Sequence, residues 1–193
     1  MKRLILALIL LATPVHASQI TASNGIVYLT GKIDSGDERI FDARTANMPA
    51  GTIVKLGSNG GNLLSAMKIG TIVSNRGFDT WASTWAPCAS ACTLIWFSGR
   101  HAIVQRNTLL VFHMPYDSRT GVASPEGAVL MSAYLQSLGL TQTQADFLAT
   151  TPSEGWPATE AAARRLGFRW QLIVNILGNG LHSCQQKICL TIP

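Results

Sequence analysis

The sequence has no concentrated basic segment. Beyond Lys2 and Arg3 at its start, the pair Arg164-Arg165 is the largest group of basic residues that stands out. The formal net charge is +5, and it would fall by two to +3 without Lys2 and Arg3. Proteins that bind nucleic acids usually concentrate positive charge on one face. We therefore expect no nucleic-acid partner.

The sequence also lacks an apolar run of the roughly 20 residues that a membrane-spanning helix needs. Its N-terminal apolar run, Leu4–Ala12, follows a short basic start and is broken by Thr13-Pro14. A pattern of short side chains ending at Ala17 then fits a signal-peptidase site. These features predict a signal peptide over residues 1–17, cleaved after Ala17, and a periplasmic or secreted protein. An uncleaved membrane anchor is the alternative.

Internal repeats, low-complexity tracts and linkers are also missing from the sequence. Without the predicted signal peptide, 176 residues remain. This is a typical length for one domain with a substantial core. We expect a single domain over residues 18–193.

The four cysteines do not show the two-residue spacing of zinc or redox motifs. We therefore expect neither a metal site nor a cofactor. In an oxidising compartment disulfides are favoured, and four cysteines allow three pairings. The local pairs are the simplest: Cys88 with Cys92, which requires Cys88 to lie just outside a helix, and Cys184 with Cys189. Alternatively, some of the four are small buried apolar residues.

Apolar residues alternate between strand and helix patterns through the first hundred residues. This alternation predicts right-handed β-α-β units and an α/β fold with a mostly parallel sheet and flanking helices. The tail after residue 167 receives no assignment. The expected strands are 26–30, 52–56, 78–82, 103–104 and 109–113, and the expected helices are 37–47, 62–75, 89–98, one starting at 124–126, one capped by Thr141 and Gln144, and 157–166.

Two glycines, Gly60 and Gly61, lie between an expected buried strand and a helix. Glycine permits a sharp turn whose backbone N–H groups point outward, and such groups can hold a negative charge. An ordinary strand–helix turn explains the same pattern.

Ser90 lies between Ala89 and Ala91 at the expected start of an apolar helix. The small neighbours leave room for a substrate to approach the hydroxyl group. A helix cap without chemistry is the competing interpretation.

His113 ends the apolar strand 109–113, and in parallel sheets active sites gather at the carboxyl ends of strands. A serine nucleophile needs a nearby base, which neutral imidazole supplies near pH 7. A purely structural histidine is the alternative. His101 and His182 lie in expected loops and are weaker candidates.

In order and spacing, these segments resemble the proteolytic subunit of Clp protease, a member of the crotonase superfamily. The matching segments are Asn59-Gly60-Gly61, Ala89-Ser90-Ala91 and Phe112-His113-Met114-Pro115. The resemblance extends over residues 26–167. It departs from the family where Ala91-Cys92 replaces Met-Gly after the nucleophile. The cysteine–serine segment is also similar to that of a group of bacterial periplasmic proteins.

The resemblance implies a ClpP/crotonase-like fold with Ser90 as nucleophile and His113 as general base. It further implies an oxyanion or substrate-binding site at the Gly60-Gly61 turn, with the N–H groups of Gly61 and Ala91 stabilising negative charge. The positive end of the helix that begins near Ser90 would add to this effect.

The acid of the catalytic triad is the least defined member. The family places it shortly before a helix that segment 159–167 resembles, which indicates Glu154. Ser153, Asp146 and Asp117 are rivals, and Glu154 is alternatively a solvated loop charge.

The function implied by the resemblance is an exported serine peptidase-like hydrolase that acts on peptides or small unfolded proteins. No ATPase partner is expected, because an exported protein has no ATP supply, and a homo-oligomer is left open. One alternative is an inactive relative that binds a peptide or envelope protein in the same crevice. Another is a serine–lysine site using Lys55 or Lys68.

Overall fold

The computed structural model describes residues 18–105, 107–152, 154–157, 170–174 and 188–192. For the last two segments only the backbone is described. The predicted signal peptide, the expected helix beyond Pro157 and Cys184 therefore lie outside the described residues, and the Cys184–Cys189 bridge stays a prediction.

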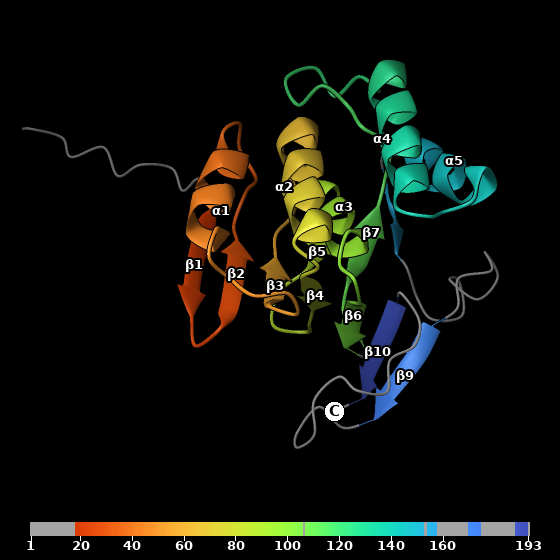
Figure 1. Cartoon of the computed structure of the whole chain (residues 1–193). Coiled ribbons are helices and arrows are strands. Elements are labelled where there is room, and N and C mark those ends of the chain that lie inside the picture. The colour runs from red at the N-terminus through yellow and green to blue at the C-terminus, as the bar shows by residue number, and fades with distance from the viewer. Residues whose placement is uncertain (1–17, 106, 153, 158–169, 175–187, 193) are drawn as a thin grey trace, which may run out of the picture.

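A seven-stranded sheet forms the body of the molecule, in the order β1-β2-β3-β4-β6-β10-β9 (Figure 1). All neighbouring strands are parallel except β1 and β2, which form an antiparallel pair. The mostly parallel α/β sheet predicted from the sequence is thereby confirmed. The strands are β1 (Gln19–Ser23), β2 (Ile26–Thr30), β3 (Ile53–Gly57), β4 (Asp79–Ala82), β6 (Ala102–Gln105), β9 (Trp170–Val174) and β10 (Ile188–Ile192).

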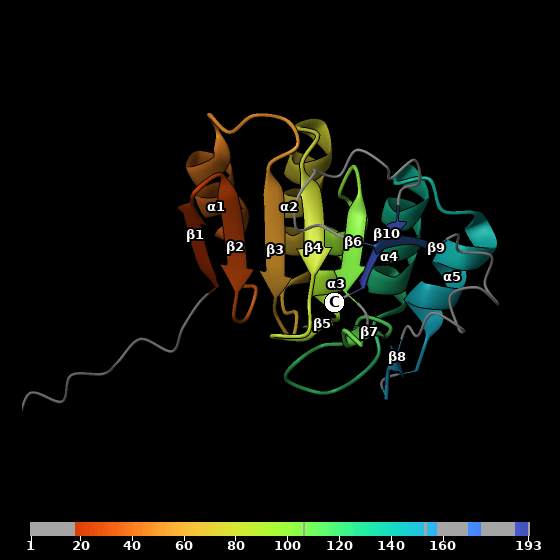
Figure 2. The same ribbon diagram turned by 90° about the horizontal axis from the view of Figure 1, so that it is seen from below.

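Helices flank this sheet, and Figures 1 and 2 place the first three of them, α1, α2 and α3, on the same face. Apolar side chains between this face and the helices form the core, with Leu56 and Ile69 fully buried. None of the described helices is long and apolar enough to cross a membrane. The helices are α1 (Asp37–Thr45), α2 (Leu63–Asn75), α3 (Ala91–Phe97), α4 (Pro125–Ser137) and α5 (Gln142–Thr150).

A second, three-stranded sheet has the order β5-β7-β8. Its strands are β5 (Cys88–Ala89), β7 (Leu110–Phe112) and β8 (Trp156–Pro157). Strand β5 runs parallel to β7, whereas β8 is antiparallel to it. Because β5 leads into Ser90 and β7 leads into His113, this small sheet aligns the two residues.

The structure adds elements that the sequence patterns did not predict. Strand β1 was not predicted, because only Ile20 of its five residues is buried and no alternating apolar pattern marks it. The unassigned tail contributes β9 and β10, which extend the large sheet through parallel pairing. Pro157, expected to begin a helix, lies instead in β8. The capping box of Thr141 and Gln144 is confirmed at the start of α5.

Gly70, in the middle of α2, marks the closest approach between three helices. A Cβ atom at this position would lie 2.0 Å from the Tyr134 hydroxyl oxygen and 2.2 Å from Ser98 Oγ. These two hydroxyl groups are hydrogen-bonded to each other at 2.9 Å and join α4 to the end of α3. Burial of the Tyr134 side chain raises its pKa to about 12. The glycine is thus required by packing rather than by a turn.

Replacement of Gly70 by alanine tests this packing. In an exposed helix the change would stabilise by about 1 kcal/mol, because glycine is a poor helix former. Here we expect destabilisation by about 1–3 kcal/mol, since the added methyl group overpacks the site. Urea denaturation measures the difference. Ser74→Ala on the exposed side of α2 is the control and should be nearly neutral, and a Gly70→Ala protein more stable than wild type would contradict the packing argument.

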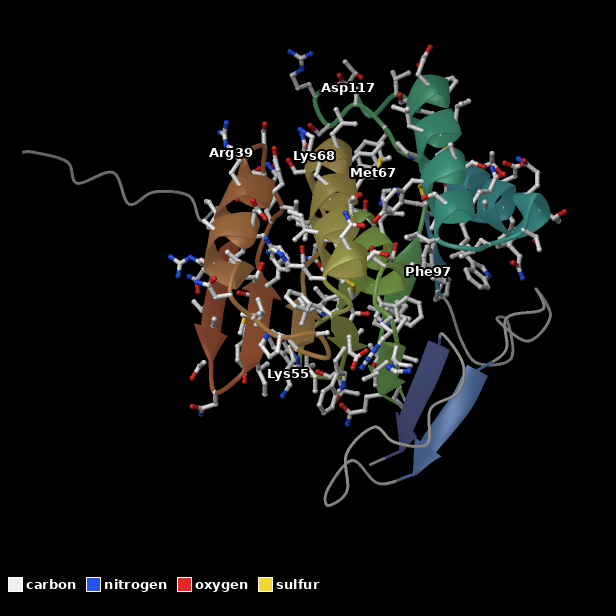
Figure 3. All side chains as sticks on the ribbon, in the orientation of Figure 1. Arg39, Lys55, Met67, Lys68, Phe97 and Asp117 are labelled. Carbon is white, nitrogen blue, oxygen red and sulfur yellow. A yellow bond between two sulfur atoms is a disulfide. The ribbon has the colours of Figure 1, made fainter. Side chains whose placement is uncertain are left out.

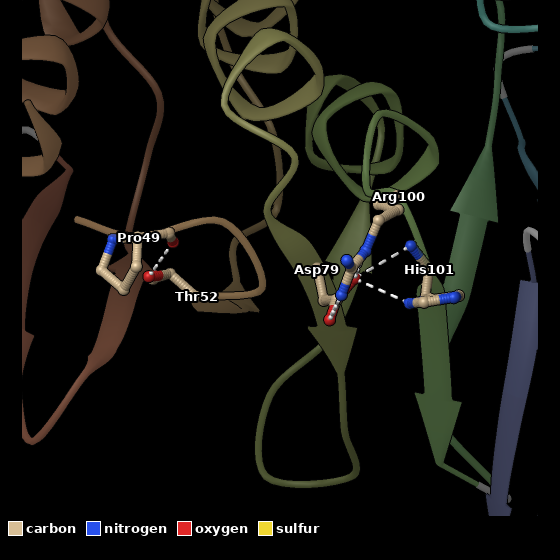
Figure 4. A network of polar contacts seen from close by, with 5 residues as sticks. All are labelled: Pro49, Thr52, Asp79, Arg100 and His101. Carbon is tan, nitrogen blue, oxygen red and sulfur yellow. Dashed lines mark hydrogen bonds and ion pairs between the residues drawn. The ribbon is translucent and has the colours of Figure 1, made fainter. Parts of the chain in front are cut away.

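At the amino end of β4, the carboxylate of Asp79 is buried to 1% exposure. It accepts hydrogen bonds from Arg100 Nε and Nη2 at 3.2 and 3.1 Å (Figure 4). The backbone N–H and ring Nδ1 of His101 lie 3.2 and 2.9 Å from the same carboxylate. These contacts join the starts of β4 and β6. His101, a weak candidate for catalysis by sequence, is therefore part of a structural network.

The Asp79 network predicts a large cost for Asp79→Ala. Loss of a buried carboxylate that binds several donors should lower the free energy of unfolding by about 3 kcal/mol. Asp42→Ala removes an ion pair with Arg76. Because the Asp42 side chain is 57% exposed, this change should lower the free energy of unfolding by less than about 1 kcal/mol. Equal effects of the two substitutions in chemical denaturation would show that the Asp79 network does not stabilise the fold.

Candidate active site

A cavity of about 850 Å³ opens at the carboxyl ends of the strands. Its walls come from the segments that follow β2, β3, β5 and β7, the positions where parallel sheets usually bind ligands. Of the predicted site residues, it brings together Gly60, Gly61, Ser90, Ala91 and His113. Glu154 is not among the lining residues.

Ser90 occupies a sharp turn between β5 and α3. Its backbone has φ 55° and ψ −129°, a conformation that costs a non-glycine residue on the order of 1–3 kcal/mol. The side chain makes no capping hydrogen bond to α3 and remains partly exposed. The Ser90 side chain therefore does not cap the helix. A strained strand–helix turn of this kind presents its side-chain oxygen to the cavity above the sheet.

Several contacts hold this turn in place. The Ser90 N–H donates to the Val111 carbonyl at 2.8 Å, which continues the pairing of β5 with β7. Its own carbonyl accepts from the N–H of Thr93 at 2.9 Å and from the Thr93 hydroxyl at 2.6 Å. Both peptide groups of Ser90 are thus anchored while the side chain is left free of the backbone.

A disulfide joins Cys88 in β5 to Cys92 in α3 across this turn, with a Cα–Cα distance of 5.3 Å. The bridge requires Cys88 to lie outside the helix, and the structure meets that condition. Both cysteines are completely buried. The three residues between them, with Ser90 in the centre, therefore form a closed loop.

Gly60 packs directly beneath the serine turn. A Cβ atom at Gly60 would lie 2.6 Å from the Cβ of Ser90 and 2.8 Å from the nitrogen of Ala91. At Gly61 a Cβ atom would lie 2.1 Å from the Ile33 carbonyl oxygen. Their φ angles of 91° and 144° also favour glycine. The glycine pair therefore allows the end of β3 to approach the nucleophile candidate.

The N–H groups around Ser90 differ in availability. That of Gly60 donates to the hydroxyl of Ser58 at 3.0 Å. Those of Gly61 and Ala91 have no hydrogen-bond acceptor among the described residues. Both residues line the cavity, so these two groups are the ones free to bind a negatively charged oxygen.

His113 follows β7 and is partly exposed at the cavity wall. Its Nδ1 lies 2.8 Å from the carbonyl oxygen of Met114. Its ring lies beside that of Tyr116, with 5.3 Å between the ring centroids. Within the described part of the chain, no hydrogen bond joins His113 to Ser90. The structure thus brings the two residues into one cavity without a hydrogen bond between them.

Glu154 is exposed, and no hydrogen bond or ion pair joins it to His113 or to another described residue. Its role as the acid stays a prediction. Its rivals are engaged elsewhere. Hydrogen bonds from the backbone N–H groups of Arg119 and Thr120 lower the pKa of Asp117. Hydrogen bonds from the Ser132 hydroxyl and, to a smaller extent, from the Gln142 side chain lower the pKa of Asp146. Ser153 lies outside the described residues.

The lysines proposed for a serine–lysine site do not line the cavity. Lys55 Nζ lies 4.6 Å from the ring centroid of Trp81 and 5.7 Å from that of Tyr28, an arrangement that favours cation–π contact. Lys68 forms an exposed ion pair with Glu38 at 3.4 Å. Figure 3 shows the two lysines well apart, with Lys68 on α2 and Lys55 below the strands of the large sheet.

Two residues that line the cavity, Leu94 and Met131, were not predicted from the sequence. Leu94 and Met131 are only 1% and 3% exposed, yet both border the cavity and give it an apolar floor. No motif of the sequence singled them out, because both belong to largely apolar helical segments. Among the described residues, no three His, Cys, Asp or Glu side chains are grouped to hold a metal ion.

Comparisons with known proteins reveal similarity only in structure. No family model and no curated protein matches the sequence. One similar solved structure is the 1510-N membrane-bound stomatin-specific protease with a substrate peptide, at 22% identity, TM-score 0.54 and coverage of 74% of this chain and 71% of that one. Another is ClpP1 from Listeria monocytogenes, at 14% identity, TM-score 0.55 and coverage of 75% and 88%.

The ClpP protease catalytic domain from Plasmodium falciparum is a third similar structure, at 16% identity and TM-score 0.54. It covers 74% of this chain, and the match covers 81% of that domain. At these identities the likeness establishes architecture. The chain has the ClpP-like α/β fold, with a mostly parallel sheet and flanking helices.

Proposed function

We propose that the protein is a serine peptidase-like hydrolase with Ser90 as nucleophile and His113 as general base. The observation that carries the proposal is the strained, disulfide-closed turn that leaves the Ser90 side chain uncapped in the cavity that His113 also borders. The ClpP-like fold supports a peptidase at the level of the family. A helix cap or a core histidine would need neither the exposed hydroxyl nor the free N–H groups nearby.

The reaction follows from the positions of these groups. Ser90 Oγ attacks the carbonyl carbon of a peptide bond while the His113 imidazole accepts the hydroxyl proton. The carbonyl oxygen becomes negatively charged and accepts hydrogen bonds from the N–H groups of Gly61 and Ala91. The imidazolium then protonates the leaving amine, and an acyl-enzyme forms. Water, deprotonated by His113, hydrolyses this ester and restores Ser90.

The substrate class follows from the cavity and the sequence. An open cavity of about 850 Å³ with the apolar floor of Leu94 and Met131 suits a short extended peptide with an apolar side chain. The N-terminal pattern over residues 1–17 supports export. Because an exported protein has no ATP supply, we expect it to act on peptides or small unfolded proteins without ATP. Self-association stays a prediction.

A fluorophosphonate probe, which labels activated serines, tests the proposal. We expect the purified protein to be labelled, Ser90→Ala to abolish labelling, and His113→Ala to slow it by about 100-fold or more, since the base is lost. In-gel fluorescence over time gives the rates. Ser118→Ala is the matched control, because Ser118 also borders the cavity but is exposed and lies in a loop.

The labelling result can overturn the assignment in two ways. Labelling that survives in Ser90→Ala would mean that another serine reacts. A folded wild-type protein that resists the probe and cleaves no member of a peptide library would show that the site is not a hydrolase.

The Cys88–Cys92 bridge yields a separate prediction. In the double variant Cys88→Ala, Cys92→Ala, the turn at Ser90 loses its covalent closure and can relax from its strained conformation. We expect the rate of labelling to fall about tenfold, which lies within the range of about 1–3 kcal/mol that such backbone strain costs.

Circular dichroism on the double variant provides the control, because the ClpP-like core must remain folded for the comparison to hold. If the folded variant is labelled at the wild-type rate, the backbone contacts to Val111 and Gly60 suffice to hold Ser90, and the bridge has no part in positioning it.

A further inference from the structure

The ring of His113 has a main-chain partner where a serine hydrolase usually has a carboxylate. The partner is the carbonyl oxygen of Met114, 2.8 Å from Nδ1. A carbonyl oxygen only accepts hydrogen bonds, so Nδ1 must carry the proton for this contact to form. The neutral ring then has its lone pair on Nε2. This is the tautomer that a triad acid normally selects.

The Met114 carbonyl lies in a backbone segment that is fixed on both sides. The Met114 N–H donates to the Thr151 carbonyl at 2.7 Å, and Thr151 is only 5% exposed. The Pro115 carbonyl accepts from the N–H of Ser124 at 2.8 Å. Proline at 115 also restricts Met114 to extended conformations. The acceptor is therefore held by the fold rather than by a mobile side chain.

No described acidic side chain competes for this position. In the part of the chain that the structure describes, no carboxylate forms an ion pair or hydrogen bond with His113. Asp34 borders the same cavity, but it pairs with Lys32 at 3.1 Å. The carbonyl of Met114 is thus the group that orients the ring.

We propose that the Met114 main-chain carbonyl replaces the triad acid, so that the site is a serine–histidine dyad positioned by the backbone. This inference rests on the proposed function. It makes Met114 a positioning residue: its carbonyl holds the proton on Nδ1 and leaves Nε2 to accept the proton of Ser90. A neutral carbonyl stabilises the imidazolium less than a carboxylate does, so the dyad is slower than a complete triad.

The tautomer can be measured without any activity. Nitrogen-15 NMR of the histidine-labelled full chain near pH 8, with the His113 signals assigned by loss in His113→Gln, identifies which ring nitrogen carries the proton. We expect Nδ1–H. A proton on Nε2 would overturn the proposal. If Nδ1–H is found but the fluorophosphonate probe does not react, the orientation stands and the hydrolase assignment fails.

Substitution of Glu154 separates the backbone from a carboxylate as the orienting group. In Glu154→Gln we expect the Nδ1–H signal to persist and the labelling rate to stay within twofold of wild type. The matched changes Asp117→Asn and Asp146→Asn should behave alike. A fall of 100-fold or more in Glu154→Gln, together with a mixture of tautomers, would show that Glu154 reaches His113 in the working enzyme and would overturn the proposal.

Pro115→Ala loosens the carbonyl without removing it. We expect a several-fold lower labelling rate and partial appearance of the Nε2–H tautomer, because Met114 gains access to other backbone conformations. Circular dichroism controls for folding. A folded Pro115→Ala protein with the wild-type tautomer and the wild-type labelling rate would show that the fixed Met114 carbonyl does not position the ring, and would overturn the proposal.

Discussion

The left-handed backbone of Ser90 is the constraint on which the proposed site depends. A serine with φ 55° is unfavourable by itself, so the surrounding fold must hold it there. The β5–β7 pairing fixes its N–H, the Cys88–Cys92 bridge closes the loop around it, and the absence of a side chain at Gly60 makes room beneath it. In this turn the Ser90 side chain makes no capping hydrogen bond to α3 and borders the cavity.

Polar groups at the two ends of the parallel sheet differ in whether they are hydrogen-bonded within the protein. At the amino ends, the buried Asp79 carboxylate binds Arg100 and His101 and joins neighbouring strands. At the carboxyl ends, the N–H groups of Gly61 and Ala91 instead have no acceptor in the part of the chain that the structure describes. Such free groups lower stability, and they are what a ligand can bind. Polar residues at one end therefore stabilise the fold, whereas those at the other end are available for chemistry.

Much of this could be predicted from the sequence, because the relevant signals are local. Gly60-Gly61 and His113 each follow an apolar segment readable as a strand, and Ser90 was expected at the start of an apolar helix. Parallel strands then bring their carboxyl ends together. Strand β1 could not be predicted, since only one of its side chains is buried. The family resemblance indicated Glu154 as the acid, and this stays a prediction, because position along the sequence carries no information on which group faces an imidazole ring.

By itself, the sequence determined the α/β class, the order of the main strands and helices, and several of the residues that gather in the cavity, among them Ser90 and His113. These follow from apolar periodicity and from glycine and proline, which act over a few residues. The tertiary structure alone decided that Ser90 is strained rather than a helix cap and that the Met114 carbonyl is the partner of His113. Both depend on contacts between segments distant in the sequence, such as Met114 with Thr151, and on backbone groups that every residue shares.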